Sequence, residues 1–201
     1  KMQETADPPE ALARIPRLSI HDLERTNKII PLAQPSGFPT RVLYHDLFTN
    51  QILYLDLGFD LHCLPRTCLP YVPLFGRALT ELGTDREDFA AFSRRISRKT
   101  GGIRPDLFAS ATSGSRASAP WLFLRGKAMM DQTEDLFAIL HDMLFATRFD
   151  NPERFRQMVL EEKARLEHKL VPAGHQVVNL RLRAQFSEAD WVMEQMHGVS
   201  Y

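Results

Sequence analysis

The sequence has too few cysteines for a disulfide framework, no long apolar run and no excess of either charge. Cys63 and Cys68 are its two cysteines, which excludes a disulfide-rich secreted fold and favours a reducing compartment or indifference to redox state. No stretch reaches the roughly 18 apolar residues of a membrane span, and the first residues lack a signal-peptide pattern. Lys+Arg and Asp+Glu number 25 each, so no net field attracts nucleic acid or an anionic membrane.

The remaining composition is that of a globular protein. Hydrophobic residues make up 44% and charged residues 25% of the 201 positions, which excludes disorder of the whole chain. This length suits one large domain or two small ones with a real core. Because the first residue is Lys1 rather than Met, we expect the chain to be a fragment of a longer protein.

Proline is concentrated at the start of the chain, where residues 1–40 hold six of the 13 prolines. Proline fixes φ and removes a hydrogen-bond donor, so we expect residues 1–40 to be an extended connector. One short helical turn is predicted around residues 19–23, with Ser19 as its cap. We expect the folded domain to occupy residues 41–201.

An antiparallel hairpin is predicted next, from a strand over 42–48, a turn at 49–51 and a strand over 52–61. The second strand alternates apolar and polar residues. Its expected apolar face is Leu53, Leu55, Leu57, Phe59 and Leu61, and its expected mixed face is Tyr54, Asp56, Gly58 and Asp60. A sheet with one apolar face needs helices on that side.

Helical spacing follows the hairpin. One helix is predicted with Tyr71, Leu74, Phe75, Ala78 and Leu82 on its buried face and Gly83 as its stop. A second is predicted with Thr84 and Glu87 as a capping box, a buried stripe of Phe89, Phe92 and Ile96, and an end at Gly101-Gly102.

A second strand pair is predicted over 103–112 and 120–129, joined by a small polar loop that is a candidate for disorder or partner contact. Helices then follow, one from Asp131 and one from Asn151-Pro152 that breaks at Pro172-Ala173-Gly174. Another is expected from His175 and a last one capped by Ser187. The predicted order is β-β-α-α-β-β-α-α-α, an α+β fold with a mainly antiparallel sheet covered by helices.

A metal site is the first chemistry to weigh. His62, Cys63 and Cys68 lie close in sequence, and His45 on the predicted neighbouring strand could add a ligand. Zinc usually takes three or four ligands, with a second ligand pair elsewhere, and no second cysteine pair exists. The motifs His-Glu-x-x-His and His-x-x-Glu-His are both absent. We therefore expect a loop histidine and two thiols, with no metal-binding, cofactor-binding or catalytic residue in this chain.

Two other groups of residues have a functional and a structural interpretation. Asp46, Asp56 and Asp60 with His45 and Tyr54 could form an acid/base set, but a water-facing sheet surface is the simpler interpretation. The basic cluster Arg94, Arg95, Arg98, Lys99 and Arg104 lacks aromatic neighbours for stacking on bases. A solvated helix end, whose cations complement the helix dipole, is the simpler interpretation of this cluster, and contact with an acidic substrate or partner is the alternative.

Several long motifs, in order, resemble the presequence-protease group of insulinase-like (pitrilysin-type) zinc metallopeptidases. They are His45-Asp46-Leu47-Phe48-Thr49-Asn50, Tyr54-Leu55-Asp56-Leu57-Gly58-Phe59-Asp60, Leu69-Pro70-Tyr71-Val72-Pro73-Leu74-Phe75 and Arg98-Lys99-Thr100-Gly101-Gly102-Ile103. Residues 3–12 resemble the linker between the two halves of such enzymes, and residues 171–198 also fit. The resemblance covers nearly the whole chain.

The resemblance implies the third of four LuxS/MPP-like metallohydrolase domains, the peptidase-associated domain, which is non-catalytic. Residues 1–40 would link the two halves, and zinc would be bound by another domain of the parent enzyme. The implied partners are the N-terminal catalytic half of the same polypeptide and unstructured peptide substrates. Since such enzymes occur in bacteria and organelles, the implied location is the cytoplasm of a bacterium or an organellar matrix of a eukaryote, in soluble form.

Three functions follow as hypotheses. The first is a non-catalytic wall of the chamber in which a zinc metalloendopeptidase degrades short unstructured peptides, serving substrate enclosure and contact between halves. The second is a stand-alone module that holds extended peptides on its sheet edge without hydrolysis. The third is an independent hydrolase that uses the His45, His62, Cys63 and Cys68 group.

Overall fold

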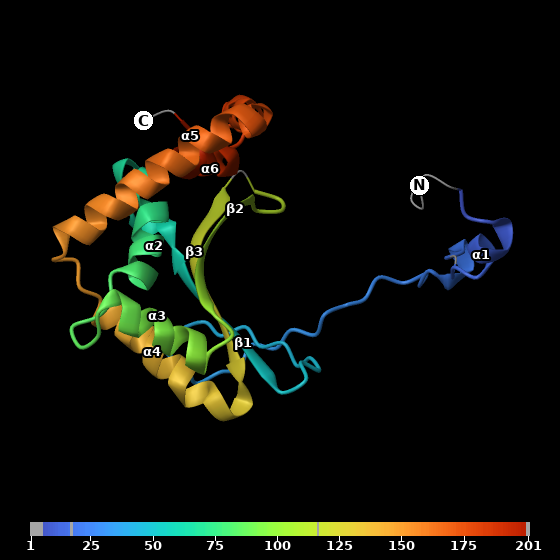
Figure 1. Ribbon diagram of the computed structural model, residues 1–201, viewed down its shortest axis with the longest axis horizontal. Coiled ribbons are helices and arrows are strands. Elements are labelled where there is room, and N and C mark those ends of the chain that lie inside the picture. The colour runs from blue at the N-terminus through green and yellow to red at the C-terminus, as the bar shows by residue number, and fades with distance from the viewer. Residues whose placement is uncertain (1–5, 17, 116, 200–201) are drawn as a thin grey trace. The chain divides into compact units, whose positions relative to one another are not determined.

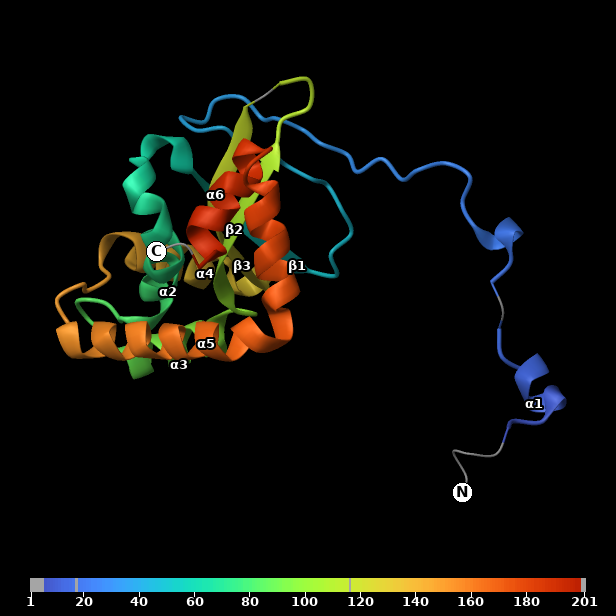
Figure 2. The ribbon, with the colours of Figure 1, turned by 90° about the horizontal axis from the view of Figure 1, so that it is seen from above.

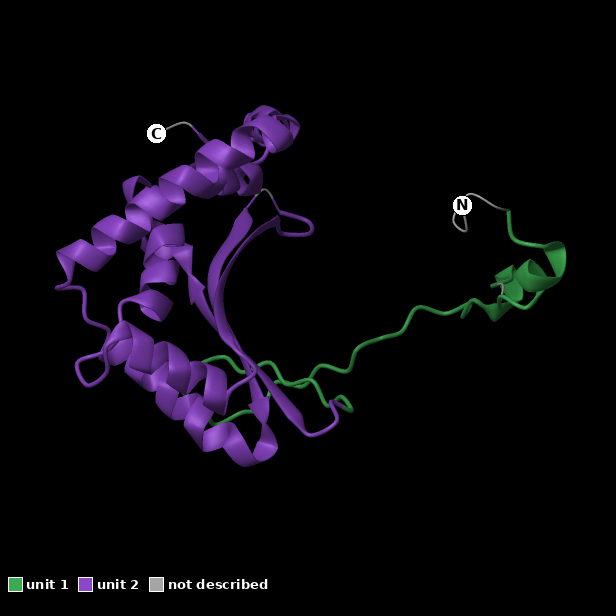
Figure 3. Cartoon of the chain, viewed as in Figure 1, with its two compact units in different colours: residues 1–48 green, residues 49–201 purple. Residues whose placement is uncertain are grey.

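The computed structural model describes residues 6–16, 18–115 and 117–199. Contacts divide the chain after Phe48 into two compact units, residues 1–48 and 49–201 (Figure 3). Parts of three sequence-based expectations lie outside the described residues: positions 3–5 of the linker motif, Arg116 of the predicted polar loop and the last two residues.

The first unit contains little regular structure. It holds helix α1 (Pro9–Ala13), the 3₁₀ turn η1 (Ile20–Asp22) and one bridge between Ala33 and Tyr44. The Ser19 side chain accepts the His21 N–H, which confirms the predicted cap. Every described residue of this unit except Val42 is exposed. The described part of the proline-rich stretch therefore has no apolar core of its own.

The second unit carries the folded layers. Its order is β1 (Ile52–Asp60), η2 (Leu61–Cys63), η3 (Arg66–Tyr71), α2 (Val72–Glu81), α3 (Phe89–Lys99), β2 (Ile103–Ala111), β3 (Ser118–Met129), η4 (Met130–Gln132), α4 (Thr133–Phe145), α5 (Pro152–Arg183) and α6 (Glu188–His197) (Figure 1). Three antiparallel strands lie in the order β1-β3-β2. The expected α+β class with an antiparallel sheet is confirmed.

The predicted strand over 42–48, and with it the first hairpin, is wrong. Tyr44 forms only the isolated bridge to Ala33, and β1 pairs with β3 instead, with Leu55 opposite Gly126. The predicted order β-β-α-α-β-β-α-α-α therefore has one strand too many at its start. Asn50 and Gln51 both have positive φ, so the chain does turn where a turn was predicted.

Helices cover one face of the sheet. Figure 1 shows α2, α3 and α4 on one side of the curved strands, and α6 lies beside β2 in both Figures 1 and 2. The main core cluster joins Leu124 of β3 to Phe92 of α3 and Leu136 of α4. A second joins Leu122 to Val192 and Met196 of α6. The predicted apolar face of β1 is confirmed at Leu53, Leu55 and Leu57, which pack on the main cluster.

Two helix predictions need correction in detail. Helix α2 buries Val72, Ala78 and Leu79, whereas Tyr71 and Phe75 are exposed. Tyr71 ends the preceding 3₁₀ turn, so it does not share the α-helical phase. In α3 the cap is Asp88, whose side chain accepts the Ala91 N–H, instead of Thr84. Phe92 and Ile96 are buried as predicted, whereas Phe89 is partly exposed.

Helices α5 and α6 begin where they were predicted, whereas α4 begins at Thr133, after the 3₁₀ turn that contains the predicted start Asp131. The Asn151 side chain caps α5 by accepting the Arg154 N–H, and Ser187 caps α6. The expected break at Pro172-Ala173-Gly174 is a kink, because only Ala173 leaves helical geometry, at φ −115° and ψ 18°. The segment from His175 therefore continues α5 after a bend.

The polar loop between β2 and β3 is short. Gly83, with φ 82°, ends α2 as predicted. Among the described helices, none is long and apolar enough to cross a membrane.

Candidate functional site

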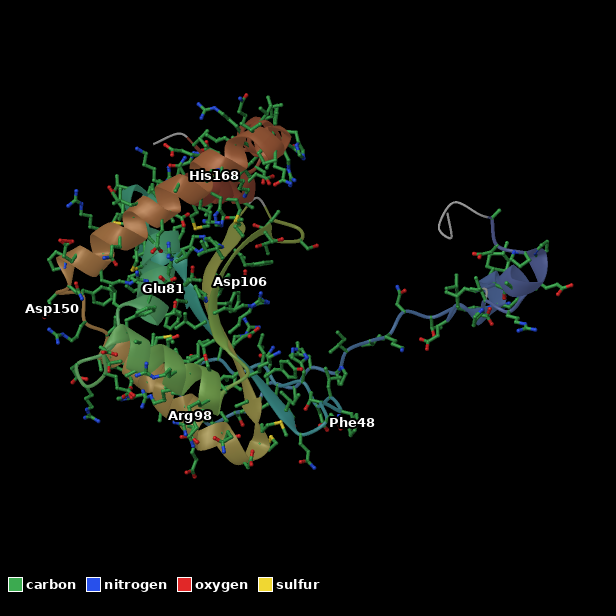
Figure 4. All side chains as sticks on the ribbon, in the orientation of Figure 1. Phe48, Glu81, Arg98, Asp106, Asp150 and His168 are labelled. Carbon is green, nitrogen blue, oxygen red and sulfur yellow. The ribbon has the colours of Figure 1, made fainter. Side chains whose placement is uncertain are left out.

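The face of the sheet opposite the helices is the candidate functional site, and we call it the uncovered face. Its side chains alternate along each strand with those of the core. They are Tyr54, Asp56, Gly58 and Asp60 of β1, Trp121, Phe123, Arg125 and Lys127 of β3, and Arg104, Asp106 and Phe108 of β2. Figure 4 labels Asp106 on this side and Glu81 of α2 on the other.

Register places these side chains in three rows across the sheet. Asp56, Arg125 and Arg104 form the first row, and Gly58, Phe123 and Asp106 form the second. Asp60, Trp121 and Phe108 form the third. The face therefore has a charged end, extended by Lys127 and Tyr54, and an aromatic end.

Three rings make contact at the aromatic end. The ring centre of Phe123 lies 6.0 Å from that of Trp121, with an angle of 22° between the two ring planes. It lies 6.4 Å from the ring centre of Phe108, in an edge-to-face arrangement. Gly58 is needed beneath them, because a Cβ there would lie 2.8 Å from Phe123 Cε1 and 3.2 Å from Trp121 Cε3. A side chain at position 58 would displace the rings.

Arg125 connects the two ends. Its Nε lies 3.2 Å from a carboxylate oxygen of Asp106 and 3.6 Å from one of Asp56. Its guanidinium carbon lies 5.3 Å from the centre of the Phe123 ring. The single cation of Arg125 therefore contacts two carboxylates and one ring. Arg125, Asp56 and Asp106 together carry a net negative charge.

The predicted acid/base set is divided by the fold. Asp56 and Asp60 share the uncovered face as expected, with Gly58 between them, but they bind different partners. Asp60 Oδ1 accepts the backbone N–H of His62 at 2.9 Å and lies 2.7 Å from His62 Nδ1. The backbone N–H of His62 lowers the pKa of the Asp60 carboxyl group. His45 and Asp46 belong to the first unit, where His45 Nδ1 lies 2.8 Å from the Pro31 carbonyl oxygen.

The side chains weighed as zinc ligands do not fit a zinc site. His62 Nδ1 is engaged by Asp60, and the Cys63 thiol donates to the Asp60 carbonyl oxygen at 3.0 Å. Cys63 is exposed and Cys68 half-buried, both as free thiols. Within 6–16, 18–115 and 117–199, no three His, Cys, Asp or Glu side chains gather in a way that could hold a metal ion.

The predicted basic cluster is also divided. Arg95 lies 3.0 Å from Glu87 and 2.5 Å from Asp142, and Lys99 lies 3.1 Å from Asp135. Arg98 and Lys99 occupy the last turn of α3, where cations complement the helix dipole. Arg104 lies apart from them on the uncovered face. Two of the five residues, Arg95 and Lys99, therefore tie α3 to α4.

A shallow groove of about 760 Å³ lies where the loop before α3 meets the start of α5. Arg148 and Asp150 on its wall pair with each other, and Arg154 pairs with Glu81 at 2.8 Å. Two of the three arginines on the wall, Arg148 and Arg154, are therefore already engaged by carboxylates.

Sequence reasoning missed the aromatic end, although a signal for it was present. Trp121 and Phe123 alternate with Leu122 and Leu124 in the sequence, which places the rings on one face of β3 and the leucines on the other. The alternation does not show that β3 pairs with β1 and β2, and this pairing is what brings Phe108 and Gly58 beside the two rings.

Comparison with known proteins gives a family and several relatives. The family model described as peptidase M-16C associated matches residues 1–201. The chain is 38% identical over 199 residues to presequence protease 1, chloroplastic/mitochondrial, of Arabidopsis thaliana, covering 99% of the chain and 18% of that protein. It is 28% identical to protein HypA of Clostridium perfringens, covering 99% and 21%, and 28% identical to the mitochondrial presequence protease of Yarrowia lipolytica, covering 100% and 20%. The chain thus spans about a fifth of the length of these curated relatives.

Proposed function

Because the chain belongs to the peptidase M-16C associated family, we propose that it is a non-catalytic domain in the chamber wall of a presequence-protease-like zinc metalloendopeptidase. The family match over residues 1–201 carries this proposal. It is supported by relatives about five times longer than the chain, two of them named presequence proteases. Its contribution would be enclosure of short unstructured peptides and contact between the two halves of the enzyme.

The architecture suits a wall. Helices α2, α3, α4 and α6 pack on one sheet face and make it rigid, while the opposite face presents aromatic and charged side chains. We propose that this layer is a LuxS/MPP-like domain over 41–201 and that residues 1–40 link it to the first half. The exposed, proline-rich first unit agrees with a linker.

Zinc, in this proposal, belongs to the N-terminal catalytic half of the same polypeptide. There it would activate a water molecule for peptide hydrolysis. The residues of this chain would supply neither a zinc ligand nor a general base. The compartment would be that of the parent enzyme, which is an organellar matrix in a eukaryote and the cytoplasm in a bacterium.

A stand-alone peptide-binding module is the second candidate, and the strand order favours it. The order β1-β3-β2 leaves the outer edge of β1 without a neighbouring strand among the described residues. An extended peptide can add itself to such an edge through main-chain hydrogen bonds. β2, the other edge strand, contains Pro105, which lacks one of the donors that this mode requires.

The test compares the isolated chain with the parent peptidase. We expect the purified chain with added zinc to leave a quenched fluorescent unstructured peptide uncut, and to retain no stoichiometric zinc after gel filtration. We expect the parent enzyme to lose peptide hydrolysis when residues 49–201 are deleted, while its catalytic half keeps its zinc.

Two results would contradict the proposal. One is zinc-dependent cleavage by the isolated chain that disappears in His62→Ala or Cys63→Ser. The other is tight binding of unstructured peptides by the isolated chain in isothermal titration, with no requirement for it in the parent enzyme. The second result would favour the stand-alone module.

A further inference from the structure

We propose that the aromatic end of the uncovered face is a binding subsite for an unfolded peptide segment in which an arginine or lysine stands beside an aromatic or large aliphatic residue. The proposal deepens the chamber-wall function and rests on it, since it names which side chains of an enclosed peptide the wall would hold. Its residues are Phe108, Trp121 and Phe123 with the carboxylates of Asp60 and Asp106.

The rings provide an apolar platform that the protein leaves partly open. Phe108 is 44% exposed, and Trp121 and Phe123 are half-buried on the same face. Gly58 lets the two β3 rings lie low over β1. A guest ring could stack on Phe108 or Trp121 in the arrangements that these rings already adopt with Phe123.

The charges around the rings favour a cationic guest. Asp60 and Asp106 stand at either side of the ring cluster, with side chains 50% and 41% exposed. Asp106 shares the single guanidinium of Arg125 with Asp56, and Asp60 is bonded to His62, which is cationic only when protonated. Carboxylates therefore outnumber fixed cations at this end of the face.

The cations of the face lie toward its other end. Arg104 is opposite Arg125, and Lys127 is opposite Tyr54. An acidic peptide would be repelled from the aromatic end by Asp60 and Asp106, whereas a peptide with both signs could lie along the face in one direction. Charge complementarity thus gives the subsite an orientation as well as a preference.

Arg125 shows the geometry that a guest cation would adopt. Its guanidinium sits beside carboxylates and over an aromatic ring at 5.3 Å. A guest arginine between Asp60 and the exposed faces of Trp121 and Phe108 would reproduce both contacts. Because such contacts at half-exposed sites are individually weak, the isolated chain should bind weakly, in contrast to a stand-alone module.

The chain contains an internal control for the test, since it has two tryptophans. Trp121 lies in the proposed subsite, and Trp191 packs beside the second core cluster on α6. Their indole N–H signals in ¹⁵N-labelled protein, assigned with Trp191→Phe, report separately on the two places. The probes are three unstructured peptides of 12 residues. The Arg/Phe peptide is made of Arg, Phe, Ser and Gly. The Glu/Phe peptide has Glu in place of each Arg, and the Arg/Ser peptide has Ser in place of each Phe.

We expect titration with the Arg/Phe peptide to move the Trp121 indole signal and leave that of Trp191 in place. The Glu/Phe and Arg/Ser peptides should bind at least about threefold more weakly, since each lacks one of the two contacts. The Arg/Phe affinity should fall with added salt. A silent Trp121 signal, or equal shifts with the Glu/Phe peptide, would overturn the proposal.

Variants on the face sharpen the result. Phe108→Ser and Asp106→Asn should each weaken Arg/Phe binding about two- to tenfold, and Phe108→Leu should have a smaller effect. Lys127→Gln, at the charged end of the same face, is the matched control and should not weaken binding. Unchanged affinity in both Phe108→Ser and Asp106→Asn would overturn the subsite, provided that their unfolding midpoints match that of the unaltered chain.

Failure of this inference and failure of the proposed function are distinguishable. If Trp121 is silent while the parent enzyme still needs residues 49–201 for hydrolysis, only the subsite is wrong. If Trp121 responds while deletion of residues 49–201 leaves hydrolysis intact, the chamber-wall function is wrong.

Discussion

Asp142 of α4 is a partly buried carboxylate that ties two helices together. Its Oδ2 accepts a hydrogen bond from Arg95 Nη2 of α3 at 2.5 Å, while Arg95 Nε lies 3.0 Å from Glu87. The hydrogen bond from Arg95 lowers the pKa of the Asp142 carboxyl group, and burial opposes this only in part. The ionised form is therefore the one that the fold stabilises.

This depressed pKa predicts a loss of stability in acid. Since the pKa is lower in the folded than in the unfolded chain, the contribution is complete above the unfolded value and disappears as the pH falls through the folded value. We expect Asp142→Asn to lower the free energy of unfolding by about 1–2 kcal/mol at pH 7. The difference from the unaltered chain should shrink as the pH falls below the ordinary aspartate pKa, because protonation of Asp142 removes the ionised form that Arg95 stabilises.

Urea unfolding at a series of pH values checks this prediction. Asp150→Asn is the control, because Asp150 pairs with Arg148 at an exposed position and its removal should leave stability nearly unchanged. An Asp142→Asn deficit that persists undiminished at pH 2 would show that the linkage is absent.

At the scale of single residues, the sequence predicts well which face of a strand a side chain occupies, but predicts poorly which side chains it contacts. Alternation correctly places Asp56 and Asp60 on the mixed face of β1, because side chains on a strand alternate strictly. That Asp56 shares Arg125 with Asp106 depends on the pairing of three strands. No local pattern contains that information.

Among the α-helices of the second unit, α5 has the fewest buried side chains. Across its 32 residues Met158 is the one buried side chain, and it packs with Ala78 and Leu82 of α2. Around that contact, Arg77 pairs with Glu81 and Glu161, and Arg154 pairs with Glu81. The first half of the helix is thus held by one apolar contact inside a ring of ion pairs.

We expect Met158→Ala to lower the free energy of unfolding by about 2–4 kcal/mol, because it leaves a cavity that the ion pairs cannot fill. Hydrogen exchange should also show faster opening of residues 152–165 relative to α4. Leu160→Ala, at a position that is 55% exposed, should change stability by less than about 0.5 kcal/mol. Equal effects of the two substitutions would contradict the role assigned to Met158.

The largest error in predicting elements from the sequence concerns residues 42–48. Their apolar residues resemble a strand, yet Tyr44 forms only one bridge, to Ala33, and the outer edge of β1 stays without a neighbouring strand among the described residues. Helix starts were predicted more reliably at Asn151 and Ser187, because a cap acts within a few residues of itself. Long-range pairing is what the sequence alone could not supply.

At the scale of the whole molecule, the two units differ in how they are stabilised. All three core clusters consist of residues from the second unit, whereas the described part of the first unit is almost entirely exposed. The second unit therefore contains the interactions that make unfolding cooperative.

We expect a version that begins at Thr49 to fold and to unfold cooperatively. Its midpoint should lie within about 2–4 °C of that of the full chain, the shift that about 1 kcal/mol causes in a domain of this size. Differential scanning calorimetry of the two versions measures this directly. Loss of the cooperative transition on removal of residues 1–48 would show that the first unit is part of the fold.

The position of β3 in the middle of the sheet affects how the domain is assembled during synthesis. β3 is the last of the three strands to leave the ribosome, so neither outer strand has its partner until then. β2 can join it across a short loop, whereas β1 must close a chain segment that includes two helices, at a higher entropic cost. The first strand to be made is therefore the last to be paired, and Leu53, Leu55 and Leu57 are the side chains that a nascent chain must keep from aggregation in the interval.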